Sequence, residues 1–316
     1  DVCSSDLNLI FRFSYAIPFF LASLCGIVYA IPHGLPLHVG VLIPVTVLVM
    51  AVLVNFSNDY YDHVSGVDKL VFDQRIKVAL EEAMTTDMLK KVYWEGNQFD
   101  TGLVSESQGR RIMLALSMIA VVLAVPVMFH SGWPVVALGA IGFFLLFFYT
   151  APPINLGARG MGELAVGISF FMMCFCSFYV ATGTFNAGIL VFSVMIGLVV
   201  ALMRLVDSLS SHDAHIAHGE MCLSVRIGKE RTVPVIKALV IVAYGLAAVM
   251  VAFNVLYVLL FLTVPLLIKA WRVMDERKEY WEVKAIPYFF GFSLFTELMF
   301  IAATLAALAL GQIGLF

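Results

Sequence analysis

Three carboxylates occur in one short stretch, NDYYDHVSGVD, directly after a strongly apolar segment. In a helix, the spacing of Asn55, Asn58, Asp59 and Asp62 places these side chains on one face. Clustered carboxylates repel one another, and Mg²⁺ prefers oxygen ligands that it shares with water and substrate phosphates. We therefore interpret Asp59 and Asp62 as metal ligands and the two asparagines as substrate contacts. The alternative is a solvated acidic helix end.

A second polar cluster, RLVDSLSSHDAHIAHGEMCLSVRIGKER, spans residues 204–231. Steps of three and four residues predict one helical face made of Arg204, Asp207, Ser211, His215 and His218. His212 and Asp213 lie off that face. Arg226, Lys229 and Arg231 follow and bring the positive charge that a diphosphate requires, although each alone is more typical of an ordinary cation beside a membrane.

A third stretch, YTAPPINLGARGMGE, covers residues 149–163. Its paired prolines stiffen the chain, and its glycines allow a sharp turn. Arg159 is its single basic residue, and Glu163 begins the next apolar segment. Alone, this pattern predicts only a tight loop.

The composition places these motifs in a membrane protein. Of 316 residues, 61% are hydrophobic and 13% are charged, about half the usual charged fraction of a soluble domain. The five cysteines lack paired-ligand spacing, so neither a disulfide framework nor a zinc site is expected. The expected partner is a lipid bilayer, and no nucleic acid is expected.

Nine apolar segments have about the length that a helix needs to cross the hydrocarbon core. They cover residues 9–30, 40–58, 112–129, 133–150, 163–182, 187–206, 233–253, 255–271 and 287–310. The fold class predicted is an all-α bundle of about nine transmembrane helices.

The basic residues predict how these segments are oriented. If the chain begins inside, all 19 Lys and Arg fall on the inner side of the membrane. The prediction is a multi-pass protein of the cell membrane with its N-terminus in the cytoplasm and its C-terminus outside. The acidic residues cluster on the same side, except Glu297 in the last segment. Because the positive-inside rule does not govern acids, their position indicates a polar site at the cytoplasmic face.

The whole chain, 1–316, is expected to form a single membrane domain. Residues 1–8 do not resemble the helix that follows and are interpreted as non-native, and no cleavable signal is expected because no basic region precedes the first apolar run. Residues 69–101 form an inner-loop insertion that is predicted to hold an amphipathic helix.

Together the three motifs resemble the UbiA-type intramembrane prenyltransferases. NDYYDxxxGVD, YTxPPxxLxxRGxGE and GxxxLxVRxG occur in the family's order, and the similarity extends over nearly the whole chain from about residue 9. Within the superfamily, the motifs are most similar to the menaquinone-branch enzymes that prenylate 1,4-dihydroxy-2-naphthoate. The resemblance implies a nine-helix bundle around a lipid-open cavity, with two aspartate-rich motifs that hold Mg²⁺ on an allylic diphosphate.

The resemblance also assigns roles to individual residues. Asn58, Asp59, Asp62 and Asp68 match the first motif, and Arg226 matches the arginine of the VRxG segment.

In the second motif, Ser211 and His215 stand where the family has aspartates, so Asp207 and Asp213 are the candidate metal ligands there. Imidazole suits Mn²⁺ better than Mg²⁺, so Mn²⁺ is a possible alternative metal.

The function expected is Mg²⁺-dependent transfer of a polyprenyl group from an allylic diphosphate to an aromatic acceptor such as 1,4-dihydroxy-2-naphthoate. Arg226 and Lys229 are expected to contact the diphosphate, and Asp62 or His215 to take the ring proton. Further substrate contacts are assigned to Asn55, Asn58, Tyr149, Arg159, Arg204 and Ser211.

Three alternatives remain open. In the first, the protein is a prenyltransferase of the same type whose acceptor is hydroxybenzoate, a phenazine-like ring or a glycerol phosphate. The chain is a transporter in the second, which Glu297 inside a span would suit. The third is a non-catalytic relative, which Ser211 and His215 would suit.

Overall fold

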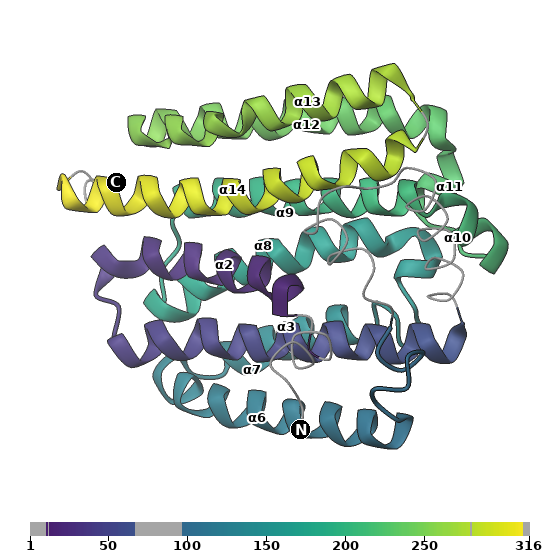
Figure 1. The fold of residues 1–316 in the computed structure, drawn as a ribbon. Helices are drawn as coiled ribbons and strands as arrows, with labels where there is room; N and C mark the ends of the chain where they lie inside the picture. Colours follow the sequence, from purple (N-terminus) through teal and green to yellow (C-terminus); the bar gives the residue numbers. More distant parts are fainter. Residues whose placement is uncertain (1–10, 12, 67–96, 279, 312–316) are drawn as a thin grey trace.

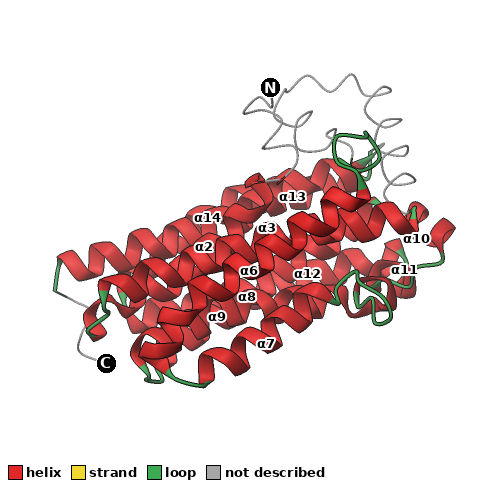
Figure 2. Cartoon of the chain, turned by 90° about the horizontal axis from the view of Figure 1, so that it is seen from below, coloured by secondary structure: helices red, strands yellow, loops and turns green. Residues whose placement is uncertain are grey.

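The computed structural model describes residues 11, 13–66, 97–278 and 280–311. Within these ranges every regular element is a helix (Figure 1), and loops alone join the helices (Figure 2). The long helices are α2 (Phe13–Ala30), α3 (Leu37–Ser65), α6 (Glu106–Ser131), α8 (Gly162–Thr182), α9 (Ala187–Ser210), α12 (Lys229–Phe253) and α14 (Trp281–Ala309). The shorter helices are η1 (Ile31–His33), α7 (Pro134–Phe147), η2 (Gly157–Met161), α10 (His212–His218), α11 (Leu223–Ile227), η3 (Val255–Thr263) and α13 (Val264–Glu276).

Eight of these helices are long and apolar enough to cross a bilayer, counting η3 and α13 together as one. The predicted all-α membrane bundle is confirmed, and every one of the nine apolar segments contains a helix. The segment 133–150 is the exception in length, because α7 has only 14 residues. At 1.5 Å per residue it spans about 21 Å, less than the hydrocarbon thickness. The protein is an integral membrane protein.

The predicted insertion at residues 69–101 lies largely outside the described residues. The predicted non-native residues 1–8 and the predicted metal ligand Asp68 also fall outside them.

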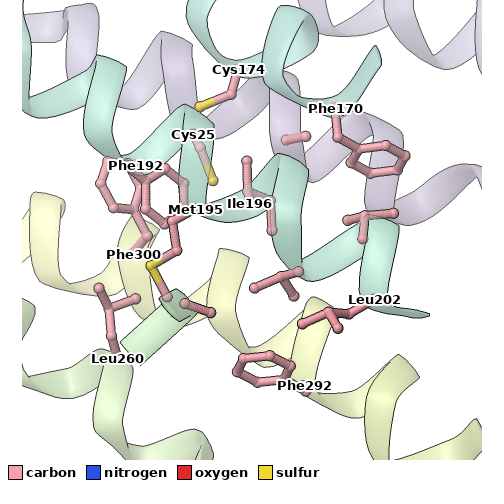
Figure 3. Close-up of a cluster of buried hydrophobic side chains, with 14 of the residues drawn as sticks. Cys25, Phe170, Cys174, Phe192, Met195, Ile196, Leu202, Leu260, Phe292 and Phe300 are labelled. Atoms are coloured by element: carbon pink, nitrogen blue, oxygen red, sulfur yellow. The ribbon is translucent and has the colours of Figure 1, made fainter. Parts of the chain in front are cut away.

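Helices α2, α8, α9 and α14 form the centre of the bundle (Figures 1 and 2). Phe192 of α9 and Phe300 of α14 stack with their ring centroids 3.5 Å apart, and Met195 and Ile196 are fully buried beside them (Figure 3). In a bilayer the lipid is as apolar as these side chains, so close packing rather than water exclusion favours their contact.

Glycines allow the central helices to approach one another closely. A Cβ on Gly26 of α2 would lie 2.1 Å from the backbone oxygen of Cys174 in α8. A Cβ on Gly197 of α9 would lie 2.6 Å from the backbone oxygen of Gly167 in α8. These contacts hold α2, α8 and α9 close to one another.

We expect Gly26→Ala to destabilise the protein, although alanine favours a helix interior by about 0.5–1 kcal/mol over glycine. The added methyl group meets backbone, so α2 and α8 must move apart, at a cost of about 1–3 kcal/mol. The midpoint of thermal unfolding in detergent measures the effect.

Gly245→Ala is the matched control, because a Cβ on Gly245 in α12 meets nothing within 4 Å. Equal midpoints for the two variants would contradict the close approach of α2 and α8.

Candidate functional site

The first acidic motif lies on α3, which continues without a break from its apolar part to Ser65. Asp59 is buried, and the side-chain Nδ2 of Asn58 donates to Oδ2 of Asp62 at 2.6 Å. The helix ends at Gly66, whose φ of 82° lies in the left-handed region and whose N–H bonds the backbone oxygen of Asp62. The helix therefore continues through the acidic motif, as predicted.

A short segment after the undescribed residues holds this end of α3 in place. The side-chain Nδ2 of Asn97 donates to the backbone oxygen of Asp59 at 2.6 Å. Phe99 packs edge-on against Phe56 and Tyr60 of α3, at centroid distances of 5.4 and 5.5 Å. These contacts fix the helical turn that carries Asp59.

The second motif does not form the single helix predicted from its spacing. Helix α9 ends at Ser210, Ser211 has φ −106° and ψ 16°, and α10 begins at His212. Before this break, Arg204 donates from Nη1 to Oδ2 of Asp207 at 2.9 Å and from Nε to the hydroxyl of Tyr149. The guanidinium therefore joins Asp207 to the connection that follows α7.

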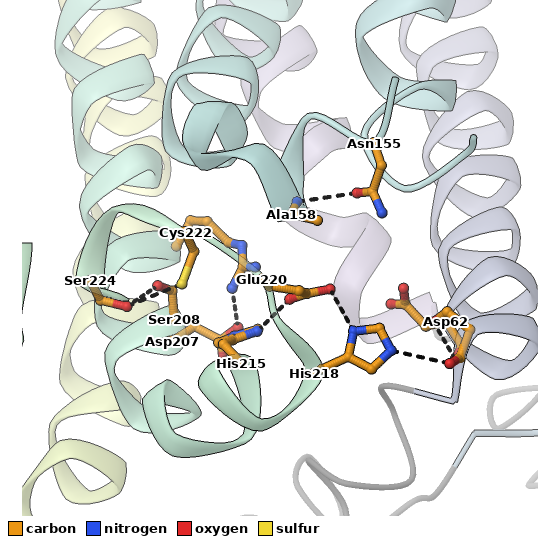
Figure 4. A network of polar contacts seen from close by, with 12 residues as sticks. Asp62, Asn155, Ala158, Asp207, Ser208, His215, His218, Glu220, Cys222 and Ser224 are labelled. Carbon is orange, nitrogen blue, oxygen red and sulfur yellow. Dashed lines mark hydrogen bonds and ion pairs between the residues drawn. The ribbon is translucent and has the colours of Figure 1, made fainter. Parts of the chain in front are cut away.

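A tight turn after α10 brings a carboxylate that the motif comparison did not include. Gly219 has φ 79°, its N–H bonds the backbone oxygen of Ile216, and the N–H of Glu220 bonds that of His215 at 2.9 Å. This is the Schellman arrangement, in which a left-handed glycine folds the next residue back onto the helix end. As a result, Oε2 of Glu220 lies 2.5 Å from Nδ1 of His215 and Oε1 lies 3.7 Å from Nδ1 of His218 (Figure 4).

The surroundings of Glu220 favour the charged form of its carboxyl group. Burial by itself raises the pKa of the carboxyl group. The hydrogen bond with His215, together with electrostatic interactions with His215, His218 and Arg204, outweighs burial, so the net effect lowers the pKa of Glu220.

Residues of both motifs line one cavity of about 330 Å³. Its polar lining consists of Asn55, Asn58, Asp59, Asp62, Tyr149, Thr150, Asn155, Arg204, Asp207, Ser211, His215 and Glu220, besides Tyr15 and Ser169. Its apolar lining includes Pro18, Phe19, Val54, Leu145, Leu146, Val166, Phe170, Val200, Met203, Ile286 and Phe290. Along α3 and α9 the apolar residues stand deeper in the bundle than the charged ones, so the cavity is polar at one end and apolar toward the membrane interior.

The charge around the cavity favours a bound cation. Within the described ranges, four carboxylates line it, from Asp59, Asp62, Asp207 and Glu220, against the single guanidinium of Arg204. Carboxylates that lie close together away from bulk water repel one another strongly. A cation between them offsets this repulsion. Among the described residues, no group of three or more His, Cys, Asp or Glu side chains encloses a metal position by itself. The carboxylate and amide oxygens of the lining are donors that Mg²⁺ accepts alongside water and phosphate oxygens.

An unpaired amide adds to this polar end. Nδ2 of Asn55 is buried and has no hydrogen-bond partner among the described residues. Since Asn55 lines the cavity, its N–H groups are available to an acceptor inside it.

The remaining predicted site residues do not line the cavity. Arg226 donates from Nη2 to the backbone oxygen of Arg159 at 2.6 Å and from Nε to that of Met221 at 2.9 Å. Arg159 donates to the backbone oxygen of Pro153. Arg226 therefore binds two chain segments together, and its predicted contact with diphosphate stays a prediction.

Lys229 and Asp213 pair with each other at 3.3 Å, on the outside of α10. The Asp213 side chain is 66% exposed. The hydrogen bond with His212, followed by the charge of Lys229, lowers its pKa despite partial desolvation. The two residues are thus brought to each other and away from the cavity, so Asp207 and Glu220, not Asp213, represent the second motif there.

Sequence comparison alone missed Glu220 and Asn155 as cavity residues. The signal for Glu220 was present as HxxHGE, because glycine after a helix end predicts a reversal that carries the next residue toward the last turn. Asn155 has φ 42° and accepts the N–H of Ala158 at 3.1 Å (Figure 4), a local turn within the third motif. No spacing rule pointed to it.

We expect Arg226→Lys to destabilise the α10–α11 end although it keeps the charge. Lysine cannot bond both carbonyl oxygens in the planar geometry of arginine, and each lost bond of this kind costs about 1.5–3 kcal/mol. Thermal unfolding in detergent, with Arg231→Lys at an exposed position as control, measures the loss. Unfolding midpoints that match the wild type would show that only the charge of Arg226 matters.

A match to a known protein supports the expected similarity over part of the chain. The 1,4-dihydroxy-2-naphthoate octaprenyltransferase of Bacillus subtilis (strain 168) is 28% identical over 162 residues. The match covers 49% of this chain and 51% of that protein, so the chain spans about half the length of the curated relative it matches.

Solved structures share the fold over nearly the whole chain. A UbiA homologue from Archaeoglobus fulgidus, bound to GPP and Mg²⁺, has a TM-score of 0.68 at 15% identity and covers 96% of this chain and 99% of its own. A structure described as digeranylgeranylglyceryl phosphate synthase in membranes has a TM-score of 0.62 at 14% identity and covers 95% and 97%. The model of the UbiA prenyltransferase family matches residues 99–302, and the chain belongs to this family.

Proposed function

We propose that this protein transfers a polyprenyl group from an allylic diphosphate to an aromatic acceptor such as 1,4-dihydroxy-2-naphthoate, in the biosynthesis of a quinone or related lipid. One observation carries the proposal: carboxylates of α3 and of the α9–α10 region line the same cavity, whose deeper wall is apolar. A substrate with a charged head and a hydrocarbon tail suits such a cavity. The name of the Bacillus subtilis relative supports the choice of acceptor.

The polar end of the cavity has the groups to bind and activate a diphosphate. Asp59, Asp62 and Asp207 would hold Mg²⁺, which neutralises the charge that develops on the leaving diphosphate. Arg204 lies beside Asp207 and adds a fixed positive charge, and the amide of Asn55 supplies a hydrogen-bond donor. Because these groups are in place before the reaction, they stabilise charge as it forms without reorganising.

The apolar end suits the prenyl chain. Phe19, Phe170 and Phe290 line it, and their ring faces stabilise positive charge on the allylic carbon once the diphosphate departs. The same wall excludes water, which would otherwise capture that carbon. The aromatic acceptor then attacks the allylic carbon with its ring, and the ring loses a proton to Asp62 or His215.

The positive-inside pattern supports a cytoplasmic site. The described Lys and Arg lie at or near the α10–α11 end of the bundle, which is also where the charged cavity residues lie (Figure 1). Cytoplasmic loops of membrane proteins carry the excess of these residues. We place this end of the bundle in the cytoplasm and the C-terminal end of α14 outside.

A glycerol phosphate is the second candidate acceptor. The observation that favours it is the structural similarity to digeranylgeranylglyceryl phosphate synthase, although at 14% identity that similarity concerns the fold alone. Both acceptors belong in the same assay.

We expect the purified protein, with Mg²⁺ and labelled geranylgeranyl diphosphate, to convert 1,4-dihydroxy-2-naphthoate into a lipid-soluble adduct. Removal of Mg²⁺ by a chelator should stop the reaction. Asp59→Asn should lower kcat by about 10²–10³-fold, because it removes part of the electrostatic stabilisation of the leaving group. Extraction of label into organic solvent, followed by mass spectrometry, measures the product.

Asp275→Asn is the control, since Asp275 pairs with Lys237 outside the cavity. Adduct formed only with hydroxybenzoate, a phenazine or glycerol phosphate would change the acceptor. Failure with every acceptor by a folded protein would defeat the proposed activity and favour a non-catalytic relative or a transporter.

A further inference from the structure

Ser211 and His215 stand where the resemblance leads us to expect aspartates, and the carboxylate of Glu220 lies in the cavity lining with them. We infer that Glu220 is the replacement: its carboxylate faces the cation from the α10 side, and His215 and His218 are positioning residues that hold it there. This inference rests on the proposed function, since it concerns the same metal and diphosphate.

The backbone fixes Glu220 from three directions. Its own N–H bonds the backbone oxygen of His215 at 2.9 Å. The N–H of Met221 bonds the backbone oxygen of Ala158 at 2.7 Å, and the oxygen of Met221 accepts a bond from Arg226. The turn is therefore attached to α10, to η2 and to α11 at once, so the carboxylate is set in position before any ligand binds.

The glycine of the third motif is needed for this attachment. Gly160 has φ 78°, and a Cβ there would lie 2.5 Å from the backbone oxygen of Met221 and 2.6 Å from Nε of Arg226. The RGxGE loop and the HxxHGE turn thus fit together only because Gly160 lacks a side chain.

The side-chain contacts leave one oxygen of Glu220 for a cation. Oε2 is hydrogen-bonded to Nδ1 of His215 at 2.5 Å, whereas Oε1 accepts no hydrogen bond from the described residues and lies 3.7 Å from Nδ1 of His218. The side chain is 14% exposed. An imidazole that holds one oxygen of a carboxylate orients the other, as outer-shell partners do at metal sites.

The imidazoles also connect the two sides of the cavity mouth. Nε2 of His218 lies 3.1 Å from the backbone oxygen of Ser65, the last residue of α3. Ser65 in turn donates from Oγ to the backbone oxygen of Asp62 at 3.0 Å. Through these contacts, the turn that carries Glu220 is connected to the end of α3 that carries Asp59 and Asp62.

The alternative is that Glu220 does not contact the cation and only offsets positive charge on its hydrogen-bond partner His215. Under that alternative, loss of Glu220 alone would leave this charge unopposed, and replacing His215 as well would restore cation binding. A double substitution therefore separates the two explanations, because it removes both the charge that needs balancing and the carboxylate.

The test is a titration of the detergent-solubilised full chain with Mn²⁺, in the presence of an unreactive thio analogue of geranyl diphosphate, with free Mn²⁺ measured by electron paramagnetic resonance. We expect Glu220→Gln to weaken Mn²⁺ binding at least about tenfold and His215→Asn to weaken it about 10–100-fold. Glu282→Gln is the matched control: its side chain is 16% exposed and pairs with Lys229, outside the cavity. It should bind Mn²⁺ as the wild type does.

The double variant E220Q/H215N decides between the explanations. Binding that stays as weak as in E220Q supports the direct role of Glu220, whereas recovery to wild-type affinity overturns it. If E220Q is not monodisperse, Glu220→Asp replaces it; its carboxylate is one methylene short, so wild-type binding by this variant would also overturn the inference.

Asp59→Asn distinguishes this inference from the proposed function. Loss of Mn²⁺ binding in D59N together with wild-type binding in E220Q defeats the role of Glu220 alone. Wild-type binding in both variants defeats the metal site of the proposed function as well.

Discussion

The arrangement of the site depends on the repulsion among carboxylates that share one small space at the membrane boundary. In the part of the chain that the structure describes, four of them line a cavity of about 330 Å³, and one guanidinium, that of Arg204, offsets part of their charge. Side chains of this kind do not gather beside apolar helices unless something holds them. The surrounding contacts do so: Asn58 bonds Asp62, and Arg204 bonds Asp207. What remains is a negative potential inside a partly apolar cavity, which divalent cations would offset.

The bundle brings these carboxylates into one cavity mainly by placing the ends of several helices side by side. Helix α3 is long enough to carry its acidic turn past its apolar part, and α9 ends where the chain must turn toward α10 and α11. The hydroxyl groups of Ser208 and Ser224 lie 2.7 Å apart and join α9 to α11 (Figure 4). Deeper in the bundle, Gly26 and Gly197 allow α2, α8 and α9 to pack closely, and apolar side chains of these helices form part of the cavity lining.

The sequence predicted the fold well because hydropathy and segment length are strong signals in a membrane protein. It also predicted that the α3 motif and Asp207 belong to one site, since helical spacing needs only local geometry. It was wrong about one helix from Arg204 to His218, because Ser211 interrupts the helix where the chain leaves the bundle. The role of Glu220 required the turn at Gly219, and the backbone contacts of Arg226 required the fold of distant segments. Neither follows from residue spacing within one helix.

The central claim is that a cation joins carboxylates of the α3 side to carboxylates of the α9–α10 side through a diphosphate. The most direct measurement is anomalous diffraction from crystals soaked with Mn²⁺ and the unreactive thio analogue of geranyl diphosphate. The account predicts anomalous peaks within about 2.0–2.3 Å of oxygens from both sides, Asp59 or Asp62 on one and Asp207 or Glu220 on the other, with diphosphate oxygens between them. Bound analogue whose metal ions lie elsewhere, or contact one side alone with the diphosphate remote from the other, would contradict it.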